Sequence, residues 1–95
     1  LYIGIGSNLG NRIKNIEKAK SFLILNGINI TKSSSYYETL SWPDVRMPKF
    51  INSVIQSDTK FSPKKLLEIF KYIEKKLGRK KDLQNYRIRQ KNFNR

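Results

Sequence analysis

The first residues whose spacing could do chemistry are three glycines, Gly4, Gly6 and Gly10, in the segment "IGIGSNLGNR" (3–12). Glycine-rich turns before a helix bind phosphate because backbone N–H groups at the helix N-terminus point at the anion. A Walker loop needs Lys-Ser/Thr after its last glycine, and the dinucleotide fingerprint needs its third glycine three residues after its second. Neither pattern is present, so the spacing favours a structural turn, with some anion-binding capacity left at the helix N-terminus.

Two further residues, Phe50 and Asn52, lie two positions apart at the start of an expected strand. An Asn carboxamide offers one acceptor and two donors, and an aromatic ring has a large apolar area to bury. Taken by themselves, the two residues are explained more simply by a buried Phe50 and a solvent-facing Asn52, and this alternative stays open.

The charge of the chain is strongly positive and unevenly distributed. Lys and Arg number 20 against 7 Asp and Glu, a net charge of +13. Residues 1–59 carry seven basic and four acidic side chains (+3), whereas residues 60–95 carry thirteen and three (+10). Such a field favours an anionic partner. For the lysines of residues 60–76, a solvated surface is an equally good explanation, but less so for the cluster that follows Gly78.

Several residue types are missing, and their absence limits the chemistry. The sequence has no Cys and no His, which excludes a thiol nucleophile, an imidazole base and a soft-metal site. A metal here would be a hard cation held by oxygen atoms. No apolar run approaches the roughly 20 residues of a membrane helix, and the N-terminus lacks the signal-peptide pattern. We therefore expect a cytoplasmic protein.

Hydrophobic periodicity and capping residues predict an α+β domain. Asn11 and Ser62–Pro63 are typical of helix starts, and Gly27 and Gly78 of helix ends. The expected order is strand 1–6, helix from 11, strand 28–38, loop 39–49, strand 50–59, helix 62–77 and a basic segment 79–95. This order predicts a ferredoxin-like (split βαβ) sandwich, with an antiparallel sheet, two helices on one face and a fourth strand that is incomplete or missing.

The chain resembles one family, the 6-hydroxymethyl-7,8-dihydropterin pyrophosphokinases, in four ordered segments: "YIGIGSNLGNRIKNIEKA", "SSSYYET", "FINSVI" and "SPKKLLEIFKYIEKKLGR". The resemblance extends to Arg79. It implies transfer of diphosphate from ATP to the hydroxymethyl group of 6-hydroxymethyl-7,8-dihydropterin, giving AMP, in folate biosynthesis. It also implies a Mg²⁺ cofactor. Gly6, Ser7 and Asn8 would shape the floor of the site, with ATP lying elsewhere.

For the pterin, the resemblance assigns roles to five residues. Phe50 would stack on the pterin, and Asn52 would pair with its ring edge. The backbone at Thr39 and Leu40 would contact it, although Leu40 stands where the family often has Pro. Tyr86 would take the position of a Trp that relatives carry in a loop over the site.

For the nucleotide, the resemblance points to Glu74, Arg79, Lys81 and Arg89, with Arg79 and Arg89 as catalytic residues. Arg suits bidentate phosphate contacts. For Glu74 the residues alone favour a helix-surface pair with Lys71. Residues 79–91 match a flexible basic loop that closes over ATP. A shifted register would place Arg87 where Arg89 is expected, and a disordered basic tail is the alternative.

The largest departure from the family lies at Asn92 and Asn94, where relatives carry an Asp-x-Asp pair that holds two Mg²⁺ ions. Neutral amides keep an oxygen but lose the charge that Mg²⁺ prefers, so we expect no metal ligands in this chain. We expect one domain over 1–95, and a fragment, a frameshifted copy and a degenerate relative stay open. A non-catalytic pterin- or nucleotide-binding remnant is the main alternative function, followed by a small basic nucleic-acid-binding module.

Overall fold

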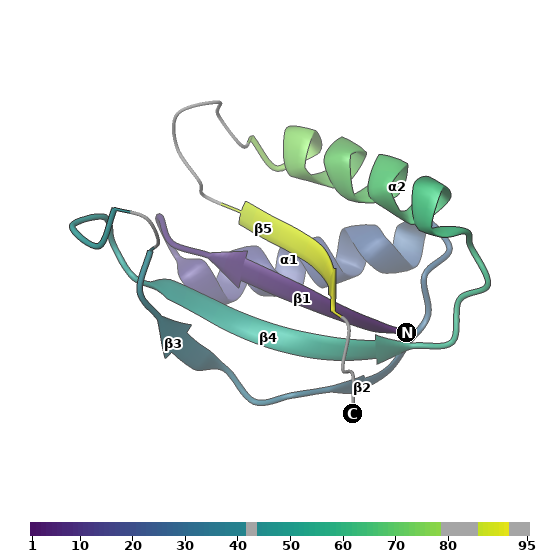
Figure 1. Ribbon diagram of the computed structural model, residues 1–95, viewed down its shortest axis with the longest axis horizontal. Helices are drawn as coiled ribbons and strands as arrows, with labels where there is room; N and C mark the ends of the chain where they lie inside the picture. The colour runs from purple at the N-terminus through teal and green to yellow at the C-terminus, as the bar shows by residue number, and fades with distance from the viewer. Residues whose placement is uncertain (42–43, 79–85, 92–95) are drawn as a thin grey trace.

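The computed structural model describes residues 1–41, 44–78 and 86–91, the last range as backbone with the side chain of Ile88. Two helices and five strands follow one another in this part of the chain (Figure 1). They are β1 (Tyr2–Ser7), α1 (Arg12–Leu25), β2 (Ile30–Ser33), β3 (Tyr37–Thr39), β4 (Phe50–Ser57), α2 (Pro63–Lys76) and β5 (Tyr86–Lys91).

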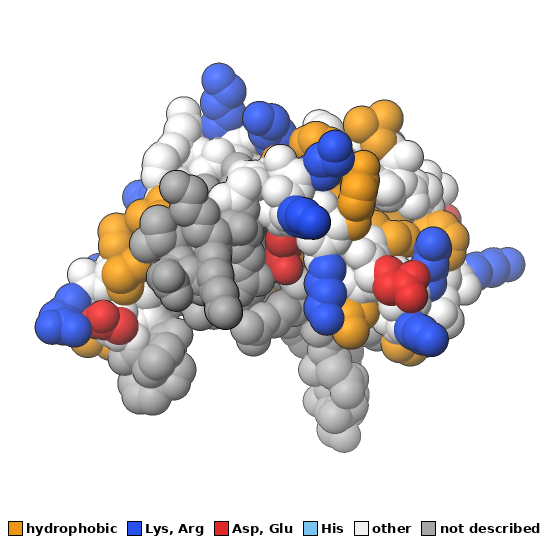
Figure 2. Space-filling model, turned by 90° about the horizontal axis from the view of Figure 1, so that it is seen from above, with side chains coloured by type: hydrophobic (Ala, Val, Ile, Leu, Met, Phe, Trp, Pro, Cys, Tyr) orange, Lys and Arg blue, Asp and Glu red, His pale blue; other side chains and the backbone are white. Residues whose placement is uncertain are grey.

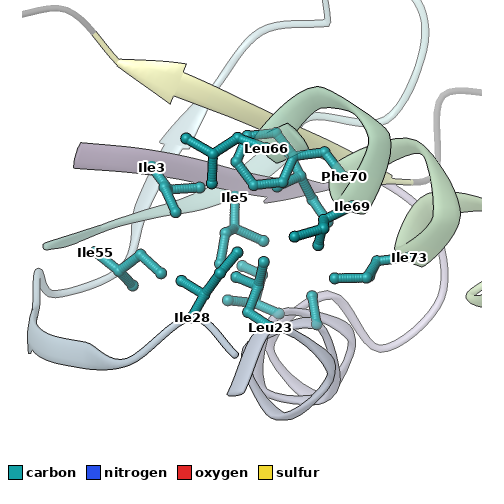
Figure 3. Packing of buried hydrophobic residues seen from close by; sticks show 12 residues of the cluster. Ile3, Ile5, Leu23, Ile28, Ile55, Leu66, Ile69, Phe70 and Ile73 are labelled. Carbon is teal, nitrogen blue, oxygen red and sulfur yellow. The ribbon is translucent and has the colours of Figure 1, made fainter. Parts of the chain in front are cut away.

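The strands form one antiparallel sheet in the order β2–β4–β1–β5, and β3 pairs with β4 beyond the end of β2. Both helices pack on the same face of this sheet. Their apolar residues join those of the strands in one buried cluster (Figure 3): Ile3, Ile5, Ile16, Ala19, Leu23, Ile28, Ile55, Leu66, Ile69, Phe70, Ile73 and Ile88. The ferredoxin-like α+β prediction is confirmed.

The helix boundaries agree with the capping residues. The Asn11 side chain accepts a hydrogen bond from the Lys14 backbone N–H at 3.1 Å, and Ser62 Oγ accepts one from Lys65 N–H at 3.2 Å. Both caps satisfy donors that the first helical turn leaves without partners. Gly27, with φ of +88°, ends α1 in the left-handed conformation that glycine adopts readily.

The strand expected over 28–38 is divided into β2 and β3. Ser33 pairs with Ile55 and Tyr37 with Asn52, so three residues on one side oppose two on the other. At this bulge, Ser34 Oγ accepts the Val54 N–H at 2.8 Å, a bond that a regular ladder gives to a backbone carbonyl. Serine side chains compete with the backbone in this way, and the extra residue resets which side chains share a face.

The fourth strand of the fold is present as β5, which corrects the expectation of an incomplete or missing strand and of a loop through residue 91. β5 pairs with β1 from Tyr2↔Lys91 to Ser7↔Tyr86. Ile88 explains the pairing, because its side chain is only 4% exposed and its position faces Ile5 in the ladder. Residues 79–85 of the expected loop lie outside the described residues.

Candidate functional site

The face of the sheet opposite the helices carries the residues expected at the pterin. Side chains alternate along a strand, so Ile3, Ile5 and Ile55 enter the helix-side core while Gly4, Gly6, Phe50, Asn52 and Val54 lie on the other side. We call these last five residues the helix-free face. Thr39 pairs with Phe50, and Gly6 pairs with Asn52. The structure therefore brings Thr39, Leu40, Phe50 and Asn52 together where β3, β4 and β1 meet.

Asn52 is held in one orientation by its neighbours. Its Nδ2 donates to the Tyr37 carbonyl at 3.2 Å and to Thr39 Oγ1 at 2.9 Å. The Tyr37 carbonyl can only accept, so the amide group must point its nitrogen that way. Both donors are thereby used, and Oδ1 lies beside Gly6, 2.7 Å from where a Cβ on that glycine would be. Of the two donors and one acceptor that its type allows, the amide has already used both donors on neighbours within the described residues.

Phe50 is completely buried yet lies outside the helix-side cluster. Its Cδ1 lies 3.1 Å from the position of a Cβ added to Gly6, so the ring packs against the bare backbone of β1. With none of its surface exposed, the ring can stack on a ligand only if neighbouring atoms move away. Tyr37, the register partner of Asn52, is 43% exposed and already offers an accessible ring. Sequence reasoning missed Tyr37, although it directly precedes the "ET" of the matched segment.

The glycine-containing segment 6–10 is a hydrogen-bonded turn, as its spacing favoured. Asn15 Nδ2 donates to Ser7 Oγ at 3.0 Å and to the Leu9 carbonyl at 2.9 Å. Gly10 has φ of +68°, the left-handed conformation that the turn requires. Ser7 and Asn8 are buried, at 0% and 2% exposure. The turn is therefore a hydrogen-bonded connection between β1 and α1, and the place of Gly6, Ser7 and Asn8 in the floor of the site stays a prediction.

A charged cluster that the sequence did not reveal joins α1 to the start of β4. Arg12 Nη1 donates to the Lys49 carbonyl at 2.9 Å and lies 3.4 Å from Glu38 Oε2. Lys49 Nζ lies 3.9 Å from Glu38 Oε1. Glu38 is on β3, directly before Thr39, so this cluster ties β3 to the helix start beside the expected site. The three charged residues are far apart in the sequence, so their contacts could not be predicted from it.

The residues expected at the nucleotide are only partly within the described chain. Glu74 Oε2 accepts a hydrogen bond from the Ile88 backbone N–H at 3.3 Å, so this carboxylate ties α2 to the outer edge of β5. Arg79 and Lys81 lie outside the described residues, as do Asn92 and Asn94. For Tyr86 and Arg89 the backbone is described: Tyr86 pairs with Ser7, and Arg89 pairs with Gly4.

The ladder register distinguishes the two arginines of β5. Tyr37, Asn52, Gly6 and Arg87 form one row across β3, β4, β1 and β5. Adjacent strands lie about 4.8 Å apart, so the Arg87 backbone is about 10 Å from that of Asn52. Arg89 stands in the row of Gly4 and Val54, and Gly4 comes two residues before Gly6 in β1. The register thus puts Arg87, not Arg89, level with Asn52.

The basic residues of α2 are spread over its exposed surface. Figure 2, which views the molecule from the side of α2, shows Lys and Arg side chains separated by apolar and neutral ones. Lys64, Lys65, Lys71, Lys75 and Lys76 are all exposed. Within the described residues no group of three or more His, Cys, Asp or Glu could hold a metal ion. No helix in those residues is long and apolar enough to cross a membrane.

The arrangement defines a ferredoxin-like domain whose helix-free face carries two glycines, an oriented amide and an aromatic ring. A family model described as 7,8-dihydro-6-hydroxymethylpterin-pyrophosphokinase (HPPK) matches residues 2–91. The chain belongs to this family.

Named relatives from plants and bacteria agree with the family match. A mitochondrial folate synthesis bifunctional protein of Pisum sativum is 42% identical over 77 residues, covering 81% of this chain and 15% of that protein. The 2-amino-4-hydroxy-6-hydroxymethyldihydropteridine pyrophosphokinase of Aquifex aeolicus (strain VF5) is 39% identical over 84 residues, which are 84% of this chain and 49% of the relative. The Bacillus subtilis (strain 168) protein of the same name is 34% identical, with 86% and 50% covered. The chain therefore spans at most about half of these relatives.

Proposed function

We propose that this chain takes part in transferring diphosphate from ATP to the hydroxymethyl group of 6-hydroxymethyl-7,8-dihydropterin, in folate biosynthesis. The hydroxymethyl oxygen would attack the β-phosphorus of ATP and lose its proton to water, while the bond from that phosphorus to the oxygen bridging the α- and β-phosphates would break, so that AMP leaves with this oxygen. Such a transfer needs little covalent help from the protein, so positioning dominates catalysis. The observation that carries the proposal is the Asn52 carboxamide, oriented by Tyr37 and Thr39 on the helix-free face.

The pterin would be recognised by its edge and by its flat face. Its exocyclic amino group and ring N–H are donors, which match Asn52 Oδ1 as an acceptor. Thr39, the last residue of β3, and Leu40, which comes directly after it, would supply backbone contacts to the pterin. Leu40 is accessible to a ligand, since it is 57% exposed. Phe50, once uncovered, and Tyr86 would enclose the ring. Tyr37 is a second stacking candidate, since it is exposed beside Asn52.

ATP would be bound by basic side chains after α2 and along β5. We propose Arg79, Lys81 and Arg89 for its phosphates, with Glu74 in the nucleotide region, and Arg79 and Arg89 as the catalytic pair. The row that Arg87 shares with Asn52 and Gly6 makes Arg87 an additional candidate. Arginine suits this task because its planar fork forms paired hydrogen bonds with phosphate oxygens.

A Mg²⁺ cofactor is a family expectation that the described residues do not fit. Mg²⁺ prefers carboxylate oxygens together with substrate phosphates, and these residues include no acidic cluster. Asn92 and Asn94, at the expected ligand positions, carry neutral amides and lie outside the described residues. This lack of ligands favours the second candidate function, a pterin- or nucleotide-binding chain that does not catalyse transfer by itself. A cytoplasmic location stays a prediction.

The test is isothermal titration of the chain with 6-hydroxymethyl-7,8-dihydropterin and, separately, with ATP. Asn52→Ala should weaken pterin binding at least tenfold, because an acceptor is lost and the Tyr37 carbonyl loses its donor, at about 1–3 kcal/mol for each such group. ATP binding should change less than twofold.

Gln56→Ala is the matched control, since Gln56 is a half-buried amide on the same strand, an even number of residues away and thus on the same face. It should leave pterin binding unchanged. Equal losses of pterin and ATP affinity in Asn52→Ala would contradict the proposal. So would equal losses of pterin affinity in Asn52→Ala and Gln56→Ala. AMP release in the presence of both substrates then separates the catalytic function from binding alone.

A further inference from the structure

The segment 40–49, which joins β3 to β4, has its two ends tied together at the base. Ser41 Oγ donates a hydrogen bond to the Pro48 carbonyl. Next to it, the Lys49 carbonyl accepts from Arg12 Nη1 at 2.9 Å. We call this closure, formed by Ser41 and Pro48, the neck of the segment. Because Thr39 and Leu40 directly precede Ser41, the neck fixes the backbone on which a pterin contact is proposed.

Asn8 lies beneath the neck and is only 2% exposed. Its Nδ2 donates to Ser41 Oγ at 3.4 Å, a long hydrogen bond between residues 33 positions apart. The single hydroxyl hydrogen of Ser41 is used on Pro48, so Ser41 Oγ can only accept at this side. The orientation of the Asn8 amide follows from this chemistry, since the reverse orientation would bring two acceptors face to face.

The other end of the Asn8 amide is its carbonyl oxygen, Oδ1. This oxygen is buried and has no partner among the residues that the structure describes, and it is the sole side-chain atom there in that condition. Buried polar atoms in folded proteins are nearly always paired, so each exception calls for an explanation. A residue needed only to hold the turn would gain from having both its nitrogen and its oxygen hydrogen-bonded, because an unpaired buried polar atom lowers stability.

We propose that Asn8 is a positioning residue of the pterin site, with its Nδ2 holding the neck and its Oδ1 reserved for a donor that it meets when the pterin is bound. This inference rests on the pterin-binding function proposed above. Asn8 follows Ser7, whose register partner Ile51 lies between Phe50 and Asn52, so the amide is at the same end of the sheet as the proposed ring contacts. Binding would then give Oδ1 the hydrogen-bond partner that it lacks among the described residues.

The experiment measures pterin and ATP affinity by calorimetry for the unsubstituted chain, Asn8→Ala and Ser41→Ala. Asn8→Ala loses both the neck contact and the reserved acceptor, so its pterin dissociation constant should rise at least tenfold. Ser41→Ala loses only the neck, and its pterin dissociation constant should rise about threefold. ATP affinity should stay within twofold in both variants, and thermal melting confirms that each is folded.

A second readout is specific to the amide oxygen. In a ¹³C,¹⁵N-labelled chain, the carboxamide carbon resonance of Asn8 should shift on adding pterin, as expected for a carbonyl that gains a hydrogen bond, and this resonance should not shift with ATP. The same measurement on Ser41→Ala keeps the test open if Asn8→Ala does not fold.

Four outcomes decide the matter. Unchanged pterin affinity in folded Asn8→Ala, equal loss of pterin and ATP affinity, or an Asn8 carboxamide resonance that pterin leaves in place would each overturn the role of Asn8 while leaving the proposed function intact. No pterin binding by the unsubstituted chain would overturn the proposed function and this inference with it.

Discussion

The helix-covered face and the helix-free face of the sheet use the same strands but depend on different properties of their side chains. Ile5 and Gly6 are neighbours in β1 and point to opposite faces. Ile5 is 1% exposed in an apolar cluster, where volume and burial are what count. Gly6 matters because it has no side chain, since a Cβ there would collide with the Asn52 amide and crowd the Phe50 ring. The helix-covered face stabilises the fold, whereas the helix-free face fixes the positions of the Asn52 amide and the Phe50 ring.

The largest effect is expected on the helix-covered face. Ile5→Ala should lower the free energy of unfolding by about 3 kcal/mol, since truncating a fully buried Ile loses transfer energy and leaves a cavity. Urea unfolding checks this, and the midpoint should fall with little change in slope. Pterin affinity of the remaining folded protein should hold within about threefold. A loss of less than about 1 kcal/mol would show that the two faces are not separated as described.

Gly6→Ala should lower stability less than Ile5→Ala does and should weaken pterin binding more. The new Cβ would lie 2.7 Å from Asn52 Oδ1 and 3.1 Å from Phe50 Cδ1, so both must shift. Overpacking of this kind lowers the free energy of unfolding by about 1–3 kcal/mol. We expect this loss to be smaller than the loss caused by the cavity in Ile5→Ala. Because Oδ1 is the proposed acceptor, pterin affinity should fall at least tenfold in calorimetry.

Gly78→Ala is the matched glycine control for Gly6→Ala. Gly78 has φ of +84°, and among the described residues nothing lies within 4 Å of an added Cβ, so the change adds backbone strain alone. We expect a stability loss of about 1–2 kcal/mol and no effect on the pterin. Pterin binding by Gly6→Ala as tight as that of Gly78→Ala would mean that the close approach at Gly6 serves packing only.

The smallest effect concerns Tyr36, in the bulge between β2 and β3. Its hydroxyl donates to Glu17 Oε2 on α1, which raises the pKa of Tyr36 to about 12, and the same hydrogen bond lowers the pKa of Glu17 below its ordinary value. Lys20 also pairs with Glu17 at 3.2 Å. The Tyr36 contribution to stability is fully present below pH 10, its ordinary pKa, and is lost as the pH rises towards 12. The Glu17 contribution is present above pH 4.5 and is lost as the pH falls below that.

Tyr36→Phe should therefore flatten both ends of the stability–pH curve by a small amount, because the pair is largely exposed and screened by solvent. Thermal melting between pH 3 and 11 measures this, with Tyr72→Phe as an exposed control on α2. A variant whose melting curve keeps the full alkaline and acid dependence of the unsubstituted chain would show that the contact contributes nothing.

The sequence predicted the helix-covered face far better than the helix-free face. Apolar spacing gave the strands and helices, and Asn11, Ser62 and Gly27 gave helix ends, because such signals act locally. The bulge at Ser34 and the pairing of β5 escaped prediction, since they depend on partners distant in the sequence, Val54 and β1. For the same reason the sequence could not predict the amide orientation of Asn52, or that the Asn8 oxygen lacks a partner among the described residues. A residue type gives its donors and acceptors, and the fold decides which are used.

Mapping pterin binding on the backbone and side-chain amides by ¹H–¹⁵N NMR tests the central claim most directly. On adding 6-hydroxymethyl-7,8-dihydropterin, resonances of Gly6, Leu40 and the Asn52 carboxamide should shift together in a saturable way. Those of Lys64 and Lys65, at the exposed start of α2, should stay in place. Shifts centred on α2, or none on the helix-free face at saturating pterin, would contradict the assignment of that face to the pterin.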